Sequence, residues 1–211
     1  MAEEPSEIDG LLRRAAAGDQ SALAQAFGCF RGRLKRMVQL RLDRRLQGRV
    51  DPSDVLQEAY LDLAKRAADY LSRPALPFFL WLRLLTGQRL LAIHRQHLGA
   101  KMRAVGQEVA LPHGVMPQAT SASLAAQLLG KLSTPSKAAM RAEMQARLLE
   151  ALNSMDAVDR EVLMLRHFEE LSNEETAAVL GLQKAAASNR YVRALKRLRS
   201  ILRSMPGLSQ P

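Results

Sequence analysis

The chain of 211 residues has one cysteine, Cys29, and few aromatic side chains, which make up 4% of the sequence. A single cysteine excludes an intramolecular disulfide, so a reducing cytoplasm is the expected location. The scarcity of aromatics beside abundant alanine, leucine and arginine favours helices over sheets. No apolar run approaches the roughly eighteen residues of a membrane span, and the acidic start lacks the apolar stretch of a secretory signal. We therefore expect an all-α protein with no membrane partner.

Motifs for chemistry are missing as well. The sequence has no glycine-rich phosphate loop, no nucleophile elbow and no paired acids in an apolar setting. His94 and His97 have a spacing that fits a metal, but no cysteine or carboxylate cluster accompanies them. We therefore predict no catalytic residue, no metal site and no cofactor, and we do not expect an enzyme.

Charge of one sign gathers in blocks along the chain, and the net charge is +10. Residues 31–49 and 81–103 are strongly basic, whereas residues 51–62 and 156–175 are acidic. The excess of positive charge indicates a polyanionic partner. Alternating blocks allow some faces to meet nucleic acid and others to meet a protein.

Helical periodicity runs through most of the sequence, without a convincing strand pattern. It predicts helices over residues 7–17, 21–46, 52–69, 78–98, 124–132, 135–155, 156–168, 171–180 and 184–203. Residues 99–134 contain glycines, prolines and a run of small residues, which is typical of an interdomain linker. We therefore predict two helical domains joined by a flexible linker: residues 1–98, the linker 99–134, residues 135–205 and a disordered tail, 206–211.

Two short helices that meet at Gly181 form the most specific pattern in the chain. Ser172 fits a helix N-cap, and Glu175 three residues later completes a capping box. Gly181 then allows a turn into a second helix whose charges are all basic: Lys184, Arg190, Arg193, Lys196, Arg197, Arg199 and Arg203. This arrangement is typical of a helix-turn-helix, whose second helix lies in the DNA major groove. A solvated basic helix in an ordinary bundle is the alternative.

The second helix has two different faces. Its core stripe is predicted to be Ala187, Tyr191, Ala194, Leu195, Leu198 and Leu202. The opposite face carries Ala185, Asn189, Val192, Arg193 and Lys196, flanked by Ser188 and Arg190. Asn189 can form two hydrogen bonds with adenine, and Arg193 can reach guanine or a phosphate. Each of these side chains, taken alone, fits a solvated surface position equally well.

Two further motifs lie in the N-terminal half. A helix opened by Pro52 would place four side chains on one face: Asp54, Gln57, Glu58 and Leu61. Such a face suits docking on a basic helix of another protein, and an ordinary solvated face is the alternative. Further along, the aromatic residues Phe78, Phe79 and Trp81 precede a run of positive charge. The aromatic rings could stack on bases, and the basic residues could follow phosphates. For Trp81, a buried anchor of its helix is the alternative.

These three blocks, in this order and spacing, resemble the bacterial sigma-70 family, in its small extracytoplasmic-function type with two domains. Residues 152–198 resemble the fourth conserved region, which recognises the −35 promoter element. Residues 51–60 resemble the helix that docks on the clamp helices of the RNA polymerase β′ subunit. Residues 78–95 resemble the part that reads and opens the −10 element.

The resemblance implies a sigma factor that binds core RNA polymerase through the β′ clamp helices and the β subunit, and directs it to promoter DNA. It implies polymerase contacts from Asp51, Asp54, Gln57 and Glu58. It implies −35 contacts from Lys184, Ala185, Ser188, Asn189, Arg190, Val192, Arg193 and Lys196, and −10 contacts from Tyr70, Arg73, Arg83, Gln88, Arg89 and Arg95. An anti-sigma factor is a further partner that it leaves open. The alternative function is a free-standing helix-turn-helix regulator that binds operator DNA without polymerase.

Overall fold

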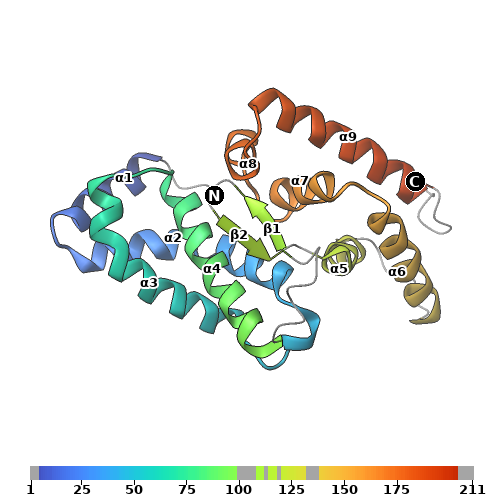
Figure 1. The fold of residues 1–211 in the computed structure, drawn as a ribbon, viewed down its shortest axis with the longest axis horizontal. Helices are drawn as coiled ribbons and strands as arrows, with labels where there is room; N and C mark the ends of the chain where they lie inside the picture. The colour runs from blue at the N-terminus through green and yellow to red at the C-terminus, as the bar shows by residue number, and fades with distance from the viewer. Residues whose placement is uncertain (1–4, 99–107, 112–113, 118–119, 132–137, 204–211) are drawn as a thin grey trace. The chain divides into compact units, whose positions relative to one another are not determined.

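The computed structural model describes residues 5–98, 108–111, 114–117, 120–131 and 138–203, and the chain forms two compact units. Unit 1, Met1–Pro117, contains α1 (Pro5–Ala16), α2 (Gln20–Arg41), a short 3-10 turn (Arg44–Leu46), α3 (Pro52–Ser72), α4 (Phe78–Leu98), β1 (Glu108–Leu111) and β2 (Gly114–Pro117). Unit 2, Gln118–Pro211, contains α5 (Ser121–Lys131), α6 (Ala138–Asn153), α7 (Ala157–His167), α8 (Asn173–Leu180) and α9 (Lys184–Arg203) (Figure 1). The all-α prediction is therefore confirmed, while the expected tail 206–211 lies outside the described residues.

Unit 1 is a helical bundle in which α2, α3 and α4 pack against one another, with α1 against α2 and α3. Fully buried aliphatic side chains from these helices form its core: Leu34, Met37, Leu56, Leu63, Leu82 and Leu90. Aspartate N-caps begin two of the helices, because Asp19 accepts from the Ser21 and Ala22 amides and Asp51 accepts from the Ser53 amide. The apolar periodicity and the cap residues together fix where the bundle helices lie.

The long helix predicted over residues 21–46 is wrong beyond Arg41. Leu42 is extended, and the Asp43 side chain accepts from the Arg45 amide at 2.9 Å to begin the 3-10 turn. The Arg45 guanidinium, hydrogen-bonded to Asp43, also lowers the pKa of that carboxyl. Aspartate favours such caps over helix interiors, because its side chain competes for backbone amides.

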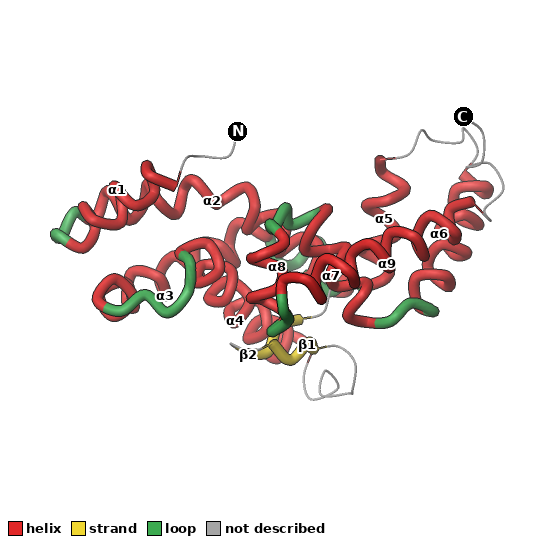
Figure 2. Tube along the Cα trace, turned by 90° about the horizontal axis from the view of Figure 1, so that it is seen from above, coloured by secondary structure: helices red, strands yellow, loops and turns green. Residues whose placement is uncertain are grey.

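The prediction of no strands is wrong for two short segments between α4 and α5. β1 and β2 pair antiparallel, with Glu108 opposite Pro117 and Leu111 opposite Gly114, and among the described residues strands are confined to this hairpin (Figure 2). β2 packs on α4, where Met116 is 1% exposed, and Arg41 donates to the Pro117 carbonyl at 2.8 Å. Part of the expected linker 99–134 therefore packs on unit 1, and its helix, α5, packs on α6 within unit 2.

Unit 2 places α7, α8 and α9 against one another, and α6 against both α5 and α9. Its core is aliphatic and includes Leu148, Leu152, Val162, Leu163, Leu165 and Ala194. Asp156 caps α7 by accepting from the Val158 and Asp159 amides, as the sequence predicts. Within the described part of the chain, every helix is too short or too polar to cross a bilayer.

Candidate functional site

The turn between α8 and α9 has the geometry that the sequence predicts. The Ser172 hydroxyl accepts from the Glu175 amide at 3.1 Å, and the Glu175 carboxylate accepts from the Ser172 amide at 2.7 Å. Gly181 then adopts the left-handed conformation, at φ 64°, and Leu182 N donates to the Ala177 carbonyl at 2.9 Å. The capping box and the turn glycine are both confirmed, and α9 begins and ends at the predicted residues.

One side chain ties the two helices together across this turn. The Asn173 amide donates to the Lys184 carbonyl at 2.9 Å, which fixes the first turn of α9 relative to the start of α8. Lys184 also lies 3.3 Å from Glu174, in an exposed ion pair worth little by itself. The helix-turn-helix is thus held by local hydrogen bonds as well as by its apolar core.

Most of the predicted DNA-contacting face of α9 is exposed. Seven of its members are solvent-accessible along one side of the helix: Lys184, Ala185, Ser188, Asn189, Val192, Arg193 and Lys196. Arg190 is half-buried, with 31% of its side chain exposed. Val192, at 46%, is an unusually exposed large apolar residue. The face therefore presents the Asn189 amide, several basic side chains and the apolar Val192 to solvent. Its contact with DNA stays a prediction.

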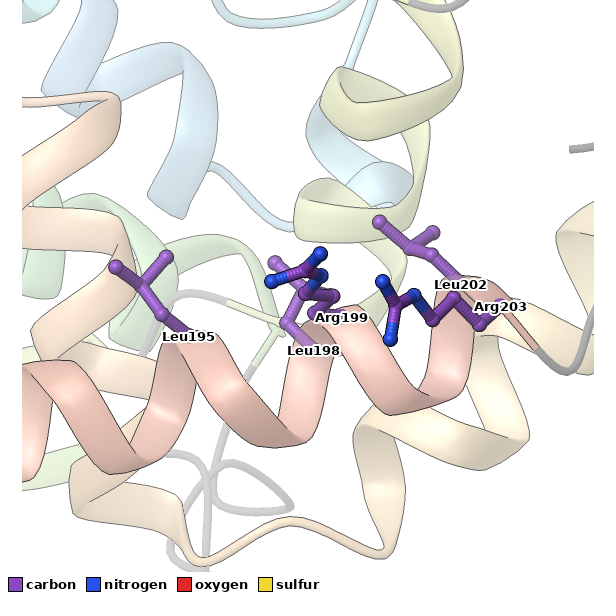
Figure 3. Close-up of a pocket in the computed structure, with 5 residues that line it drawn as sticks. All are labelled: Leu195, Leu198, Arg199, Leu202 and Arg203. Atoms are coloured by element: carbon purple, nitrogen blue, oxygen red, sulfur yellow. The ribbon is translucent and has the colours of Figure 1, made fainter. Parts of the chain in front are cut away.

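The predicted core stripe of α9 is partly wrong. Ala187, Ala194 and Leu198 are buried, but the fourth buried residue is Ile201, at 7% exposed, rather than Leu195 or Leu202. The true stripe alternates steps of four and three residues, so Leu195 and Leu202 fall one position past it. Those two residues are half-buried and line a small surface pocket with Leu198, Arg199 and Arg203 (Figure 3).

Two arginines of α9 converge on one carboxylate of α7, a relationship that the sequence reasoning missed. Arg190 donates to Asp159 Oδ1 at 2.8 Å, and Arg193 donates from Nε to Oδ2 at 3.3 Å and from Nη2 to Oδ1 at 3.4 Å. Arg190 also lies 3.4 Å from Asp156. Asp159 is 8% exposed. The acidic block 156–175 was visible in the sequence, but nothing there indicated which carboxylate would meet the basic helix.

The acidic face of α3 is arranged as the sequence predicts. Val55 and Ala59 are buried, whereas Asp54, Gln57 and Glu58 are exposed. The remaining member of this face, Leu61, is 58% exposed, which is high for a large apolar side chain. We refer to Asp54, Gln57, Glu58 and Leu61 as the α3 face.

Asp51 has a different position from the rest of the predicted polymerase-binding set. Its carboxylate accepts from the Ser53 amide at 2.6 Å as the N-cap of α3, and this hydrogen bond lowers its pKa. We therefore assign Asp51 a structural role at the start of the α3 face. Glu58 and Asp62 both pair with Arg89 of α4, Glu58 at 3.4 Å, so these charges also hold α3 against α4.

The residues that the resemblance implies for −10 contacts fall into two groups. Arg73, Gln88 and Arg95 are exposed, and Arg89 is half-buried beside the carboxylates of α3. Tyr70 and Arg83, at 9% and 2% exposed, lie in the core of unit 1. Burial removes both side chains from the surface, so direct contact with DNA by Tyr70 or Arg83 does not follow from this structure.

Trp81 stacks on Tyr70, with ring centroids 4.1 Å apart and planes 8° from parallel. The Tyr70 hydroxyl donates to the Leu76 carbonyl at 2.9 Å, and burial raises the Tyr70 pKa to about 12. These contacts fix the loop between α3 and α4 against the first turn of α4. Trp81 is half-buried, so the stacked pair anchors that loop, as in the alternative considered for this residue.

The histidine pair has a structural explanation. His94 is 2% exposed, and its Nε2 accepts from the Asp43 amide at 3.3 Å, whereas His97 is exposed. Among the residues that the structure describes, no group of histidine, cysteine and carboxylate side chains could hold a metal ion. His94 therefore supports the turn after α2.

Comparison with known proteins agrees with this geometry. Residues 145–198 match the family described as "Sigma-70, region 4", and they contain α7, α8 and most of α9. The ECF RNA polymerase sigma factor SigD of Mycobacterium tuberculosis strain H37Rv is 28% identical over 199 residues, spanning 94% of this chain and 85% of SigD. The RNA polymerase sigma-E factor of Streptomyces coelicolor is 41% identical over 58 residues, spanning 28% of this chain and 33% of that protein.

A solved structure has a similar fold. The chain of CnrH, determined in complex with the cytosolic domain of CnrY, superposes with a TM-score of 0.52 at 22% sequence identity, covering 91% of this chain and 94% of that one. At this identity the likeness concerns the fold alone. The region-4 match and the two sigma-factor relatives show that the chain is similar to the sigma-70 family, in its extracytoplasmic-function group.

Proposed function

We propose that the chain is a sigma factor that binds core RNA polymerase through unit 1 and recognises the −35 element through unit 2. The exposed face of α9 supports this proposal most strongly, because α9 is the second helix of a well-formed helix-turn-helix in the matched region. Sigma activity consists of binding and positioning, so no catalytic group is needed. The cytoplasm, where bacterial transcription occurs, is the proposed location.

On the −35 element, five exposed side chains of α9 would each make a contact that their chemistry allows. Asn189, near the start of the helix, would pair with adenine, and Arg193 would reach guanine or a phosphate. Val192, at 46% exposed, would meet a thymine methyl group. Lys184 and Lys196 would serve the phosphate backbone, which supplies affinity without sequence preference.

On the polymerase side, the α3 face would form the docking surface. An exposed leucine next to acidic and amide side chains matches the anatomy of a protein interface, in which an apolar centre is bordered by polar groups. The carboxylates would steer the face towards a basic helix, and Leu61 would supply the buried contact. Asp51 would act indirectly by capping α3.

On the separated −10 strand, we propose that Arg73, Gln88 and Arg95 make the contacts, because they are the exposed members of the implied set. Arg89 would join them if its pairing with Glu58 and Asp62 leaves donors for a phosphate. Tyr70 and Arg83 would hold the α3–α4 loop and α4 in place. We also include an anti-sigma factor among the proposed partners, because CnrH was solved with the cytosolic domain of a second protein.

Binding to purified bacterial core RNA polymerase tests the docking surface. Asp54→Lys and Leu61→Ala should each weaken the complex by tenfold or more if they lie at the interface centre, where such changes cost about 2 kcal/mol. Asp69→Lys is the matched control, because it makes the same charge change on an exposed position about 22 Å further along α3.

Unchanged affinity of both variants, with unchanged melting temperature, would show that the α3 face is not the docking surface. If the wild-type chain fails to bind core polymerase at all but binds duplex DNA selectively, the free-standing regulator is the correct function.

A further inference from the structure

Two arginines of α9, the helix proposed to contact DNA, are hydrogen-bonded to Asp159 of α7. Arg193 meets Asp159 through its Nε–Nη2 edge, at 3.3 and 3.4 Å, so both carboxylate oxygens are engaged by one planar group. A carboxylate that accepts along this edge leaves Nη1 and the second Nη2 hydrogen on the opposite edge of the guanidinium. The Arg193 side chain is 63% exposed, so most of it stays accessible beside this ion pair.

The acid itself is well fixed. Asp159 lies in the first turn of α7, its side chain is 11% exposed, and its backbone amide donates to the N-cap Asp156 at 3.2 Å. Arg190 donates to Asp159 Oδ1 at 2.8 Å, the same oxygen that accepts from Arg193 Nη2. A buried, doubly paired carboxylate on a capped helix turn has little freedom, so the arginine bound to it has less rotamer freedom to lose on binding.

We infer that Asp159 is a positioning residue for promoter recognition, which presents the outer edge of Arg193 to a guanine of the −35 element. This inference rests on the proposed function and adds a residue outside α9 to the determinants of specificity. Arginine forms two parallel hydrogen bonds with guanine O6 and N7 only when its fork is correctly oriented. Without Asp159 the guanidinium rotates freely and binds phosphates as well as bases.

Two opposite effects follow for Asp159→Asn. The change removes one negative charge beside the DNA-binding face, so affinity for nonspecific duplex should rise. Discrimination in favour of guanine at the position read by Arg193 should fall about tenfold, within the range of one bidentate contact. If Asp159 served only to join α7 to α9, its replacement would lower the affinity for specific and nonspecific DNA together and would leave the guanine preference unchanged.

Asp156→Asn is the matched control. It makes the same change of charge on the same turn, and asparagine caps a helix as well as aspartate does. Asp156 contacts Arg190 but is not a hydrogen-bond partner of Arg193. It should therefore raise nonspecific affinity while keeping the guanine preference.

The experiment selects sites from a duplex library randomised across the −35 element, using holoenzyme assembled from each full-length variant and core polymerase. Asp159→Asn and Arg193→Ala should lose preference at the same base pair, and the double variant should lose no more than Arg193→Ala alone. The inference is overturned if Asp159→Asn keeps the wild-type guanine preference. It is also overturned if Asp156→Asn loses that preference to the same extent as Asp159→Asn. Wild-type holoenzyme without any preference overturns the proposed function instead.

Discussion

Gly87 of α4 and Met116 of β2 fit together without room for another atom. A Cβ added to Gly87 would overlap Met116 Cε and lie 3.3 Å from its Sδ and 3.4 Å from its Cγ. Met116 is 1% exposed, so its thioether end would have to shift within the protein interior to admit that atom. The absence of a Cβ at Gly87 therefore lets Met116 of the hairpin pack directly on α4.

Gly87→Ala should destabilise unit 1 by about 1 kcal/mol, because overpacking costs ~1–3 kcal/mol and exceeds the ~1 kcal/mol that alanine gains over glycine in a helix. Gly28→Ala, on an exposed position of α2 with nothing near its Cβ, should stabilise instead. Urea unfolding of the full chain measures both. In a Met116→Ala background, Gly87→Ala should raise the free energy of unfolding. A stabilising effect of Gly87→Ala in the wild type would contradict the close packing of Met116 on Gly87.

Ser172→Ala should lower the stability of unit 2 by about 1 kcal/mol, because it removes the hydroxyl that accepts from the Glu175 amide. Hydrogen exchange of the α8 amides reports this change directly. Ser200→Ala, exposed in the interior of α9, is the control and should have little effect. Equal protection of α8 in the two variants would mean that the capping box does not stabilise the helix-turn-helix.

Asp19 should titrate far below an ordinary aspartate. Hydrogen bonds from Ser21, then from Arg14 and the Ala22 amide, lower its pKa to about 2. Because the folded pKa is depressed, the resulting stability is present above the unfolded value near 3.9 and is lost as pH falls towards 2. Carboxyl NMR of the full chain should show this titration, and Ser21→Ala should raise the midpoint. A wild-type midpoint near 3.9 would refute the N-cap arrangement.

Asn189→Ala should change the preferred −35 sequence, because Asn189 is exposed near the start of α9, where base edges are closest. Arg197→Ala should keep the preference but reduce the logarithmic salt slope of binding by about one unit, as expected for the loss of one phosphate contact. Site selection at matched salt compares the two. An unaltered preference for Asn189→Ala beside an altered one for Arg197→Ala would mean that the helix enters the groove differently.

Features set by neighbouring residues could be predicted from the sequence, whereas those set by distant contacts could not. The capping box of Ser172 and the turn at Gly181 depend on residues a few positions apart, and both are present in the structure. The end of α2 had a local signal in Asp43, but apolar periodicity continued past it and outweighed that signal.

The misses in unit 1 and at Asp159 have a common physical cause. The hairpin strands are four residues long and depend on Gly87 and Arg41 of distant helices, so no local pattern reveals them. Likewise, a basic residue in a basic block reads as exposed, yet Arg83 is buried by packing that only the fold determines. Pairing of Asp159 with two arginines more than thirty residues away belongs to the same class.

The most direct test of the central claim is transcription by purified bacterial core RNA polymerase from a library of promoter sequences, with and without the chain. We predict that the chain makes the polymerase start at templates sharing a −35 and a −10 element. We also expect Asp54→Lys to reduce these starts strongly while leaving the fold intact. Selective binding of duplex DNA by the chain alone, with no change in where the polymerase starts, would contradict the assignment as an initiation factor.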